Sequence, residues 1–122
     1  MTDRILLLLA ALGLVPIALS YGLLPEKSVT YLLGFQVETL NHVHVFRAIM
    51  GLYLANAILW LAGYQQPSLR KPALWSLFIF MAGLAAGRIL SLIVDGTPSF
   101  VLVFYLVAEL VFAALALKFL RQ

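Results

Sequence analysis

Hydrophobic residues fill four long stretches of this chain, and short segments rich in polar residues and proline separate them. A transmembrane α-helix requires about 20 consecutive, mainly apolar residues. Each stretch is close to that length, so the sequence predicts four membrane-spanning helices, at about 5–24, 45–64, 73–94 and 99–118. Helix-breaking sequences mark their boundaries: Pro25, Tyr64-Gln65-Gln66-Pro67, Arg70-Lys71-Pro72 and Asp95-Gly96-Thr97-Pro98.

The segment between the first two stretches carries a shorter pattern, which Gly34 is expected to interrupt. Its apolar residues recur at helical spacing, and this spacing predicts a short helix lying in the membrane interface. These residues are Val29, Leu32, Leu33 and Val37.

The composition supports a membrane protein. Hydrophobic residues make up 64% of the chain and charged residues 11%, against about 45–50% and about 25% in soluble domains. The absence of cysteine excludes disulfides and thiolate metal sites. The net charge of +3 comes from basic residues that mostly flank the apolar stretches, so we predict no nucleic-acid partner.

Basic residues flank the two ends of the predicted helices unequally. Arg4, Arg70, Lys71, Lys118 and Arg121 lie on one side, against Lys27 and Arg47 on the other. The positive-inside rule therefore places both termini in the cytoplasm, so residues 25–44 and the turn at 95–98 face outward. The predicted fold class is all-α: an integral membrane four-helix bundle with a short interfacial helix in the first outward loop, as a single domain over residues 1–122.

The first stretch has an alternative interpretation. Arg4, the apolar run and Ala18-Leu19-Ser20 also fit a secretory signal with its cleavage site. We expect this stretch to be retained as the first helix.

Two ionisable residues lie deep in the predicted spans. Glu109 lies roughly 15 Å and Arg88 roughly 9 Å below the outer edge, at about 1.5 Å per residue. Side chains lean toward the start of their own helix, so these two lean toward each other. Because charges inside a membrane need a partner or a cavity, we predict a buried Arg88–Glu109 pair. The sequence leaves open whether this pair is only structural or also lines a ligand site.

Polar and small residues share one face with this pair. On the third predicted helix they are Ser76, Gly83, Gly87, Ser91 and Asp95; on the second, Asn41, His44, Arg47, Ala48, Gly51 and Ala55; on the first, Gly13, Ser20 and Tyr21. We expect Arg47 to meet Asp95 or Glu38 at headgroup level, within a bundle whose interior turns polar toward the outer face. The candidate ligand-binding residues are Arg47, Arg88, Glu109, Asp95, His44, Asn41, Tyr105 and Ser91.

Other features have plainer explanations. Gly83 and Gly87 fit a motif for close helix packing, which we expect within the bundle rather than in a dimer. His42 and His44 lack further ligands at useful spacing, so we predict no metal, and haem would need deeper histidines. Asn56 falls opposite Arg47, so it either bonds a different helix or marks an oligomer contact. Most tyrosines and tryptophans are expected in the interfacial belts: Tyr21, Tyr31, Tyr53, Trp60, Tyr64 and Trp75.

The sequence also resembles a known family. The strings Asn41-His-Val-His-Val-Phe-Arg47-Ala-Ile-Met-Gly51-Leu-Tyr53, Gly83-Leu-Ala-Ala-Gly87-Arg88, Asp95-Gly96-Thr-Pro98 and Glu109-Leu110 carry the resemblance. The family consists of small bacterial four-helix membrane proteins with a domain of unknown function, and it is similar to the broader DoxX-like group. The resemblance implies a bacterial inner-membrane bundle, and it implies no activity.

Several functions fit these features. The first is the binding of a lipid or another lipophilic or weakly acidic ligand at Arg88 and Arg47. The second is a non-catalytic accessory or structural subunit of a larger complex, and the third is a proton-coupled oligomeric transporter that uses Glu109. No catalytic residues or cofactor are predicted, because Glu109 is the only deep carboxylate, and an enzyme acting on a lipid-like substrate is the least favoured function.

Overall fold

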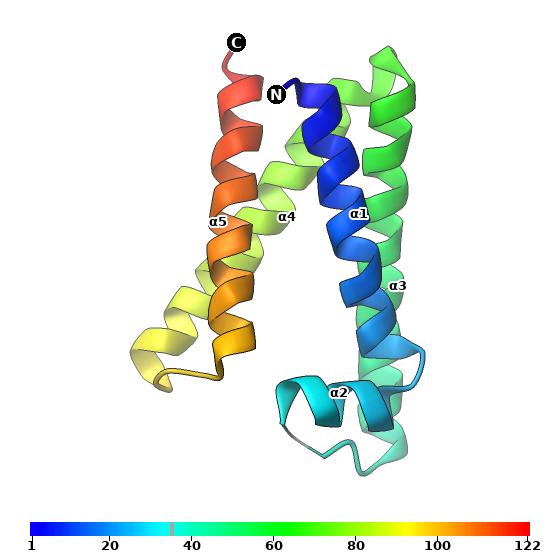
Figure 1. Ribbon diagram of the computed structural model, residues 1–122, viewed down its shortest axis with the longest axis vertical. Coiled ribbons are helices and arrows are strands. Elements are labelled where there is room, and N and C mark those ends of the chain that lie inside the picture. The colour runs from blue at the N-terminus through cyan, green and yellow to red at the C-terminus, as the bar shows by residue number, and fades with distance from the viewer. Residues whose placement is uncertain (35) are drawn as a thin grey trace.

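The computed structural model describes residues 1–34 and 36–122, and these residues form five helices and no strands (Figure 1). In chain order they are α1 (Asp3–Gly22), α2 (Pro25–Leu33), α3 (Leu40–Gln65), α4 (Pro67–Val94) and α5 (Phe100–Leu120). All except α2 are long and apolar enough to cross a membrane. The predicted all-α fold with four spanning helices and one short helix is therefore confirmed.

Polar side chains and glycines set several of these boundaries. Thr2 and Thr39 precede α1 and α3, and each side-chain oxygen accepts a hydrogen bond from a backbone N–H in the first turn. Gly34 ends α2 with a φ of 77°, which confirms the predicted interruption. Gly96 has a φ of 106° in the turn between α4 and α5. Glycine suits both positions because it has no Cβ to clash at positive φ.

Two helices begin five or more residues earlier than predicted. The helix predicted from residue 45 starts at Leu40, and the helix predicted from residue 73 starts at Pro67, so only one residue separates α3 from α4. A proline at the first helical position loses no helical hydrogen bond, because that N–H has no partner inside the helix. At the same junction, two carbonyl groups near the end of α3 accept hydrogen bonds from the Arg70 side chain. Its Nε donates to the Gly63 carbonyl (3.1 Å), and its Nη2 donates to the Tyr64 carbonyl (3.2 Å).

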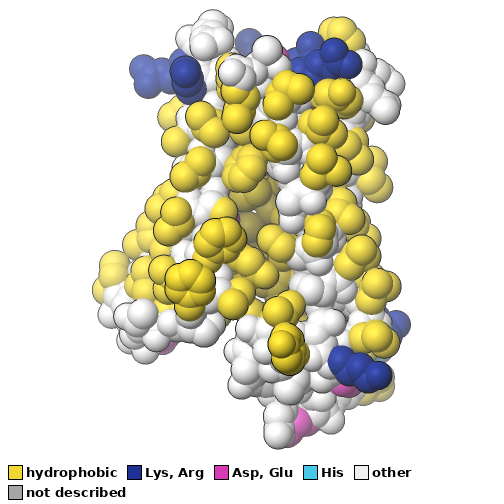
Figure 2. All heavy atoms as spheres, viewed as in Figure 1, with side chains coloured by type: hydrophobic (Ala, Val, Ile, Leu, Met, Phe, Trp, Pro, Cys, Tyr) yellow, Lys and Arg dark blue, Asp and Glu magenta, His cyan; other side chains and the backbone are white. Residues whose placement is uncertain are grey.

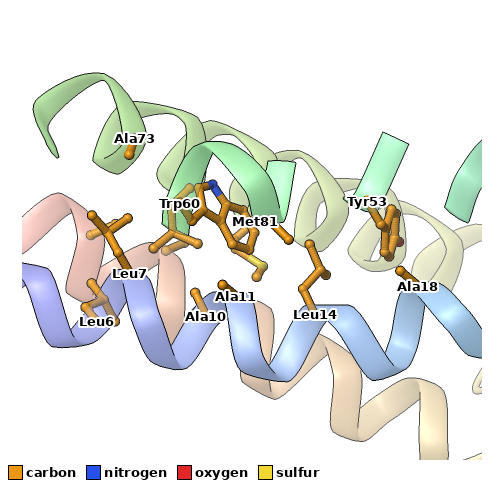
Figure 3. Packing of buried hydrophobic residues seen from close by; sticks show 14 of the residues in the cluster. Leu6, Leu7, Ala10, Ala11, Leu14, Ala18, Tyr53, Trp60, Ala73 and Met81 are labelled. Atoms are coloured by element: carbon orange, nitrogen blue, oxygen red, sulfur yellow. The ribbon is translucent and has the colours of Figure 1, made fainter. Parts of the chain in front are cut away.

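The four long helices form two pairs, with α1 packed along α3 and α4 packed along α5 (Figure 1). The pairs meet at the end of the molecule that carries both termini and separate toward the opposite end. Figure 3 shows Leu6, Leu7, Ala10 and Ala11 of α1 near Trp60 of α3, within the core at the end that carries both termini. Alanines are frequent in this core, and small residues let membrane helices approach closely.

The outer surface is unusually apolar. Large hydrophobic side chains such as Ile58 (67% exposed), Ile79 (62%) and Ile93 (78%) face outward along the helices. Soluble proteins seldom expose extended apolar surface, whereas lipid is its natural surrounding. The chain is therefore a multi-pass membrane protein.

Three aromatic residues expected in the interfacial belts are buried instead: Tyr21, Tyr53 and Trp60. The belt prediction is wrong for them because their rings pack against other aromatic rings inside the bundle: Tyr21 against Tyr53, and both Tyr53 and Trp60 against Phe80. Trp60 Nε1 donates to Ser76 Oγ (3.3 Å). Ser76 in turn donates to Asn56 Oδ1 (2.9 Å), so of the two alternatives for Asn56 the structure shows the bond to a different helix.

Candidate functional site

The candidate site is built around the predicted pair between α4 and α5. Arg88 Nε donates to both carboxylate oxygens of Glu109, at 2.8 Å and 3.1 Å. The Glu109 side chain is 8% exposed and that of Arg88 22% exposed. The predicted pair is therefore confirmed, and it is the only salt bridge among the residues that the structure describes.

Arg88 uses only part of its hydrogen-bonding capacity in this pair. A guanidinium group has five N–H donors, and four of them lie on the two Nη atoms. Within residues 1–34 and 36–122, neither Nη atom donates a hydrogen bond of good length and angle. The phenol of Tyr21 makes a weaker polar contact with the guanidinium. The ring of Tyr105 lies beneath the guanidinium, with its centre 5.7 Å from Arg88 Cζ. Among the described residues, Glu109 and Tyr21 therefore leave at least two of the Nη N–H groups without an acceptor.

The pair borders a cavity of about 270 Å³ between α1 and α5. Its wall is almost wholly apolar, and the lining residues that carry a polar group are Arg88, Glu109, Tyr53 and Tyr105. Figure 2 shows the corresponding recess, which is surrounded by hydrophobic side chains and opens sideways between the two helix pairs. The apolar lining consists of Ala10, Gly13, Leu14, Ile17, Met81, Leu84, Phe104, Ala108 and Phe112.

The two ends of this cavity are closed differently. Toward the termini, the alanine-rich core seals it. Toward the opposite end, α2 lies across part of the opening (Figure 1), and Val29 and Leu32 share a narrow cleft with Tyr21 and Tyr105. α2 covers only part of the opening, and the cavity remains open sideways between the two helix pairs, along the membrane-spanning segments (Figure 1, Figure 2).

Arg88 also borders a second hollow, a groove of about 360 Å³ between α4 and α5. Gly83 and Gly87 line this groove, and a Cβ built on either would meet no described atom within 4 Å. The prediction that these glycines pack closely within the bundle is wrong, because both face this open groove rather than a neighbouring helix.

The structure brings together only some of the candidate ligand-binding residues. Arg88, Glu109 and Tyr105 meet at the cavity, and Ser91 lines the groove beside Arg88. Asp95 instead accepts a hydrogen bond from Ser91 Oγ (2.7 Å).

The remaining candidates lie on the first turns of α3, where Asn41, His44 and Arg47 are exposed and border none of the hollows described. Among the described residues, Arg47 forms no ion pair with Asp95 or Glu38, contrary to expectation.

The predicted small-residue face of α3 does not point inward. Gly51 has open space around it, whereas the buried residues of this helix are Tyr53, Ala57, Trp60 and Gly63. The prediction failed because a small side chain marks an interface only where another helix comes close. Of the residues proposed from the first helix, Gly13 does line the cavity.

Sequence reasoning missed Tyr53 and the aromatic residues Phe104 and Phe112 of the cavity wall. One signal for Tyr53 was present: it lies eight residues into the helix predicted from residue 45, about 12 Å from its start at about 1.5 Å per residue, too deep for the interfacial belt to which it was assigned. Its ring makes edge contacts with Tyr21 (5.6 Å between centroids) and Phe80 (5.2 Å). No comparable signal distinguished Phe104 and Phe112 from lipid-facing residues.

The chain belongs to the family defined by DUF4345, a domain of unknown function, whose model matches residues 2–120. No curated protein and no solved structure matches the chain. The expected membership of a family of unknown function is confirmed, while the likeness to DoxX-like bundles remains a prediction.

Proposed function

We propose that this protein binds a small lipophilic ligand in the cavity at the Arg88–Glu109 pair, and that its role is binding rather than catalysis. The observation that carries the proposal is an arginine, with N–H donors beyond those that Glu109 and Tyr21 engage, among the residues that line an apolar cavity open to the side of the bundle. Placing a charged group inside a membrane costs free energy, so such groups usually pair with another group or line a functional cavity. Ligand sites typically combine an apolar lining with a few such polar groups.

The size of the cavity limits how much of the ligand it encloses. Its volume of about 270 Å³ lies just below the range of about 300–1,000 Å³ that is usual for drug-sized ligands. A polar head and the first few carbons fit inside. A longer hydrocarbon tail would extend sideways between α1 and α5 into the membrane.

We further propose the bacterial inner membrane as the location, with both termini cytoplasmic. The two termini lie at the same end of the bundle, and most of the basic residues visible in Figure 2 gather there. The positive-inside rule supports this orientation.

The ligand proposal is tested by filling the cavity without touching the ion pair. Gly13 lines the cavity, and a Cβ built on it meets no described atom within 4 Å, so we expect Gly13→Leu to extend its side chain into the cavity. Gly51→Leu is the matched control, because Gly51 is a helical glycine with equally open surroundings on α3. Native mass spectrometry of protein gently extracted from its own membrane gives the readout.

The wild-type protein and Gly51→Leu are expected to carry the same small molecule, and Gly13→Leu to lose it. If all three carry the same molecules in the same amounts, the cavity is not the binding site. A bare wild-type protein would also overturn the proposal.

A second candidate function, an accessory or structural subunit of a larger complex, is favoured by the groove along Gly83 and Gly87. Small residues that leave an open groove on a membrane-spanning surface can receive a helix of another protein. A stoichiometric partner that remains bound in mild detergent and is lost in Gly87→Leu would favour this function. The transporter hypothesis is less well supported, because the pairing of Glu109 with Arg88 does not suit a proton carrier.

A further inference from the structure

We propose that the cavity selects a lipophile whose head is electrically neutral and accepts hydrogen bonds, such as the carbonyl group of an ester, ketone or quinone, over an ionised carboxylate. This inference rests on the proposed ligand-binding function and narrows the chemical class of the ligand. Two observations carry it: the charges among the residues that line the cavity cancel, and the unused hydrogen-bonding groups of Arg88 are all donors.

The charge balance comes from the composition of the wall. Arg88 and Glu109 are the only charged residues among the described residues that line the cavity, and their charges cancel. A carboxylate entering the cavity would bring a net negative charge into hydrocarbon and would approach Glu109, which already occupies Arg88 Nε. A neutral head keeps the site neutral. The arginine alone suggests an acidic ligand, but its partner removes that preference.

The unused hydrogen-bonding groups of Arg88 are donors, so they favour a ligand head that accepts hydrogen bonds. Among the described residues, Glu109 accepts from Arg88 Nε and the Tyr21 phenol interacts with the guanidinium, so at least two of the four Nη N–H groups remain as donors. Arginine has no acceptor atom, so a head that can only donate gains nothing from it. A carbonyl oxygen accepts from a guanidinium without bringing a charge, and such a bond to a charged donor is stronger than one between neutral groups.

Three probes with saturated chains of similar length test this inference: methyl palmitate, palmitate and octadecane. The full-length protein is placed in phosphatidylcholine nanodiscs at alkaline pH, where the fatty acid is ionised. Binding of each radiolabelled probe is measured relative to protein-free nanodiscs, which corrects for partition into lipid. For the wild-type protein, we expect methyl palmitate to bind at least about tenfold more tightly than palmitate, which corresponds to about 1.4 kcal/mol.

A change of charge at constant shape gives the sharper test. In Glu109→Gln the amide oxygen can still accept from Arg88 Nε, but the cavity wall carries a net positive charge, so the preference should reverse toward palmitate. Glu38→Gln makes the same substitution outside the cavity, at an exposed position, and should leave the preference unchanged.

The outcomes separate the two proposals. Tighter binding of palmitate than of methyl palmitate by the wild-type protein overturns the inference and leaves the ligand-binding function in place. An equal preference in wild type and a folded Glu109→Gln variant also overturns it. Binding of octadecane as tight as that of the ester also overturns the inference, because the head would then contribute nothing. If no probe binds above the protein-free nanodiscs, the proposed function itself fails. Should Glu109→Gln not fold, the wild-type comparison alone decides.

Discussion

Removing one member of the Arg88–Glu109 pair should destabilise the protein more than removing both. Arg88→Met leaves the Glu109 carboxylate, which is 8% exposed, without its cation, while Glu109→Leu leaves the guanidinium without its anion. The double variant replaces both charges by apolar side chains in an apolar surrounding. Replacing a whole buried ion pair in this way is often neutral or stabilising, whereas breaking it is costly.

The magnitude follows from the geometry of the pair. With Arg88 Nε 2.8 Å from Glu109 Oε1, the charge centres lie about 4 Å apart, which corresponds to about 4 kcal/mol at an effective dielectric constant of 20. Removing one partner of a buried pair typically costs about 3–5 kcal/mol. Glu109→Leu should be the worst variant, because a carboxyl group left alone can take up a proton but a guanidinium cannot lose one.

The assay is reversible unfolding in mixed detergent micelles, followed by helical circular dichroism, for wild type, both single variants and the double variant. The expected coupling free energy is about 3–4 kcal/mol, and the double variant should be more stable than Glu109→Leu. Ordinary hydrogen bonds between membrane helices couple by about 0.6 kcal/mol on average. A coupling no larger than that, or a double variant less stable than either single one, would refute the description of a buried ion pair.

Two further predictions concern packing and orientation. Gly63→Ala should destabilise the protein by about 1–3 kcal/mol, because the new Cβ would overlap that of Ala73, whereas Gly87→Ala adds a Cβ in open space and should cost nothing in the same unfolding assay. Equal effects would contradict the packing. Because the chain has no cysteine, single cysteines report topology: a membrane-impermeant maleimide should label Thr97→Cys in intact cells and Gln122→Cys only after lysis. The opposite pattern would overturn the proposed orientation.

The elements predicted well from the sequence are those fixed by local chemistry. Apolar length identified the spanning helices, and Gly34 and the turn around Gly96 ended helices where expected. The ion pair was also predictable, because the tilt of side chains along a helix and the shortness of the turn bring Arg88 and Glu109 together. These inferences depend on neighbours in sequence or on one short connection, so they needed no knowledge of the packing.

The faces of the helices were not predictable in the same way. In a soluble protein the hydrophobic face marks the core, but lipid is as apolar as a protein interior, so hydrophobicity carries little information about which side faces inward. The small and polar residues were therefore used, in place of hydrophobicity, to predict which side of each helix faces the bundle interior. That signal placed Gly83, Gly87 and Gly51 at helix contacts, whereas the structure leaves all three in open space.

The cavity itself follows from unequal packing at the two ends of the bundle. At one end, a single residue joins α3 to α4, and Gly63 lets the backbone of α3 come against Ala73. Both helices are long, so α4 diverges from α3 as it continues (Figure 1) and carries Arg88 into the widening gap. Arg88 lies fifteen residues beyond Ala73, about 22 Å along the helix. The space beside the ion pair therefore depends on close packing at the far end, and sequence periodicity around Arg88 could not have revealed it.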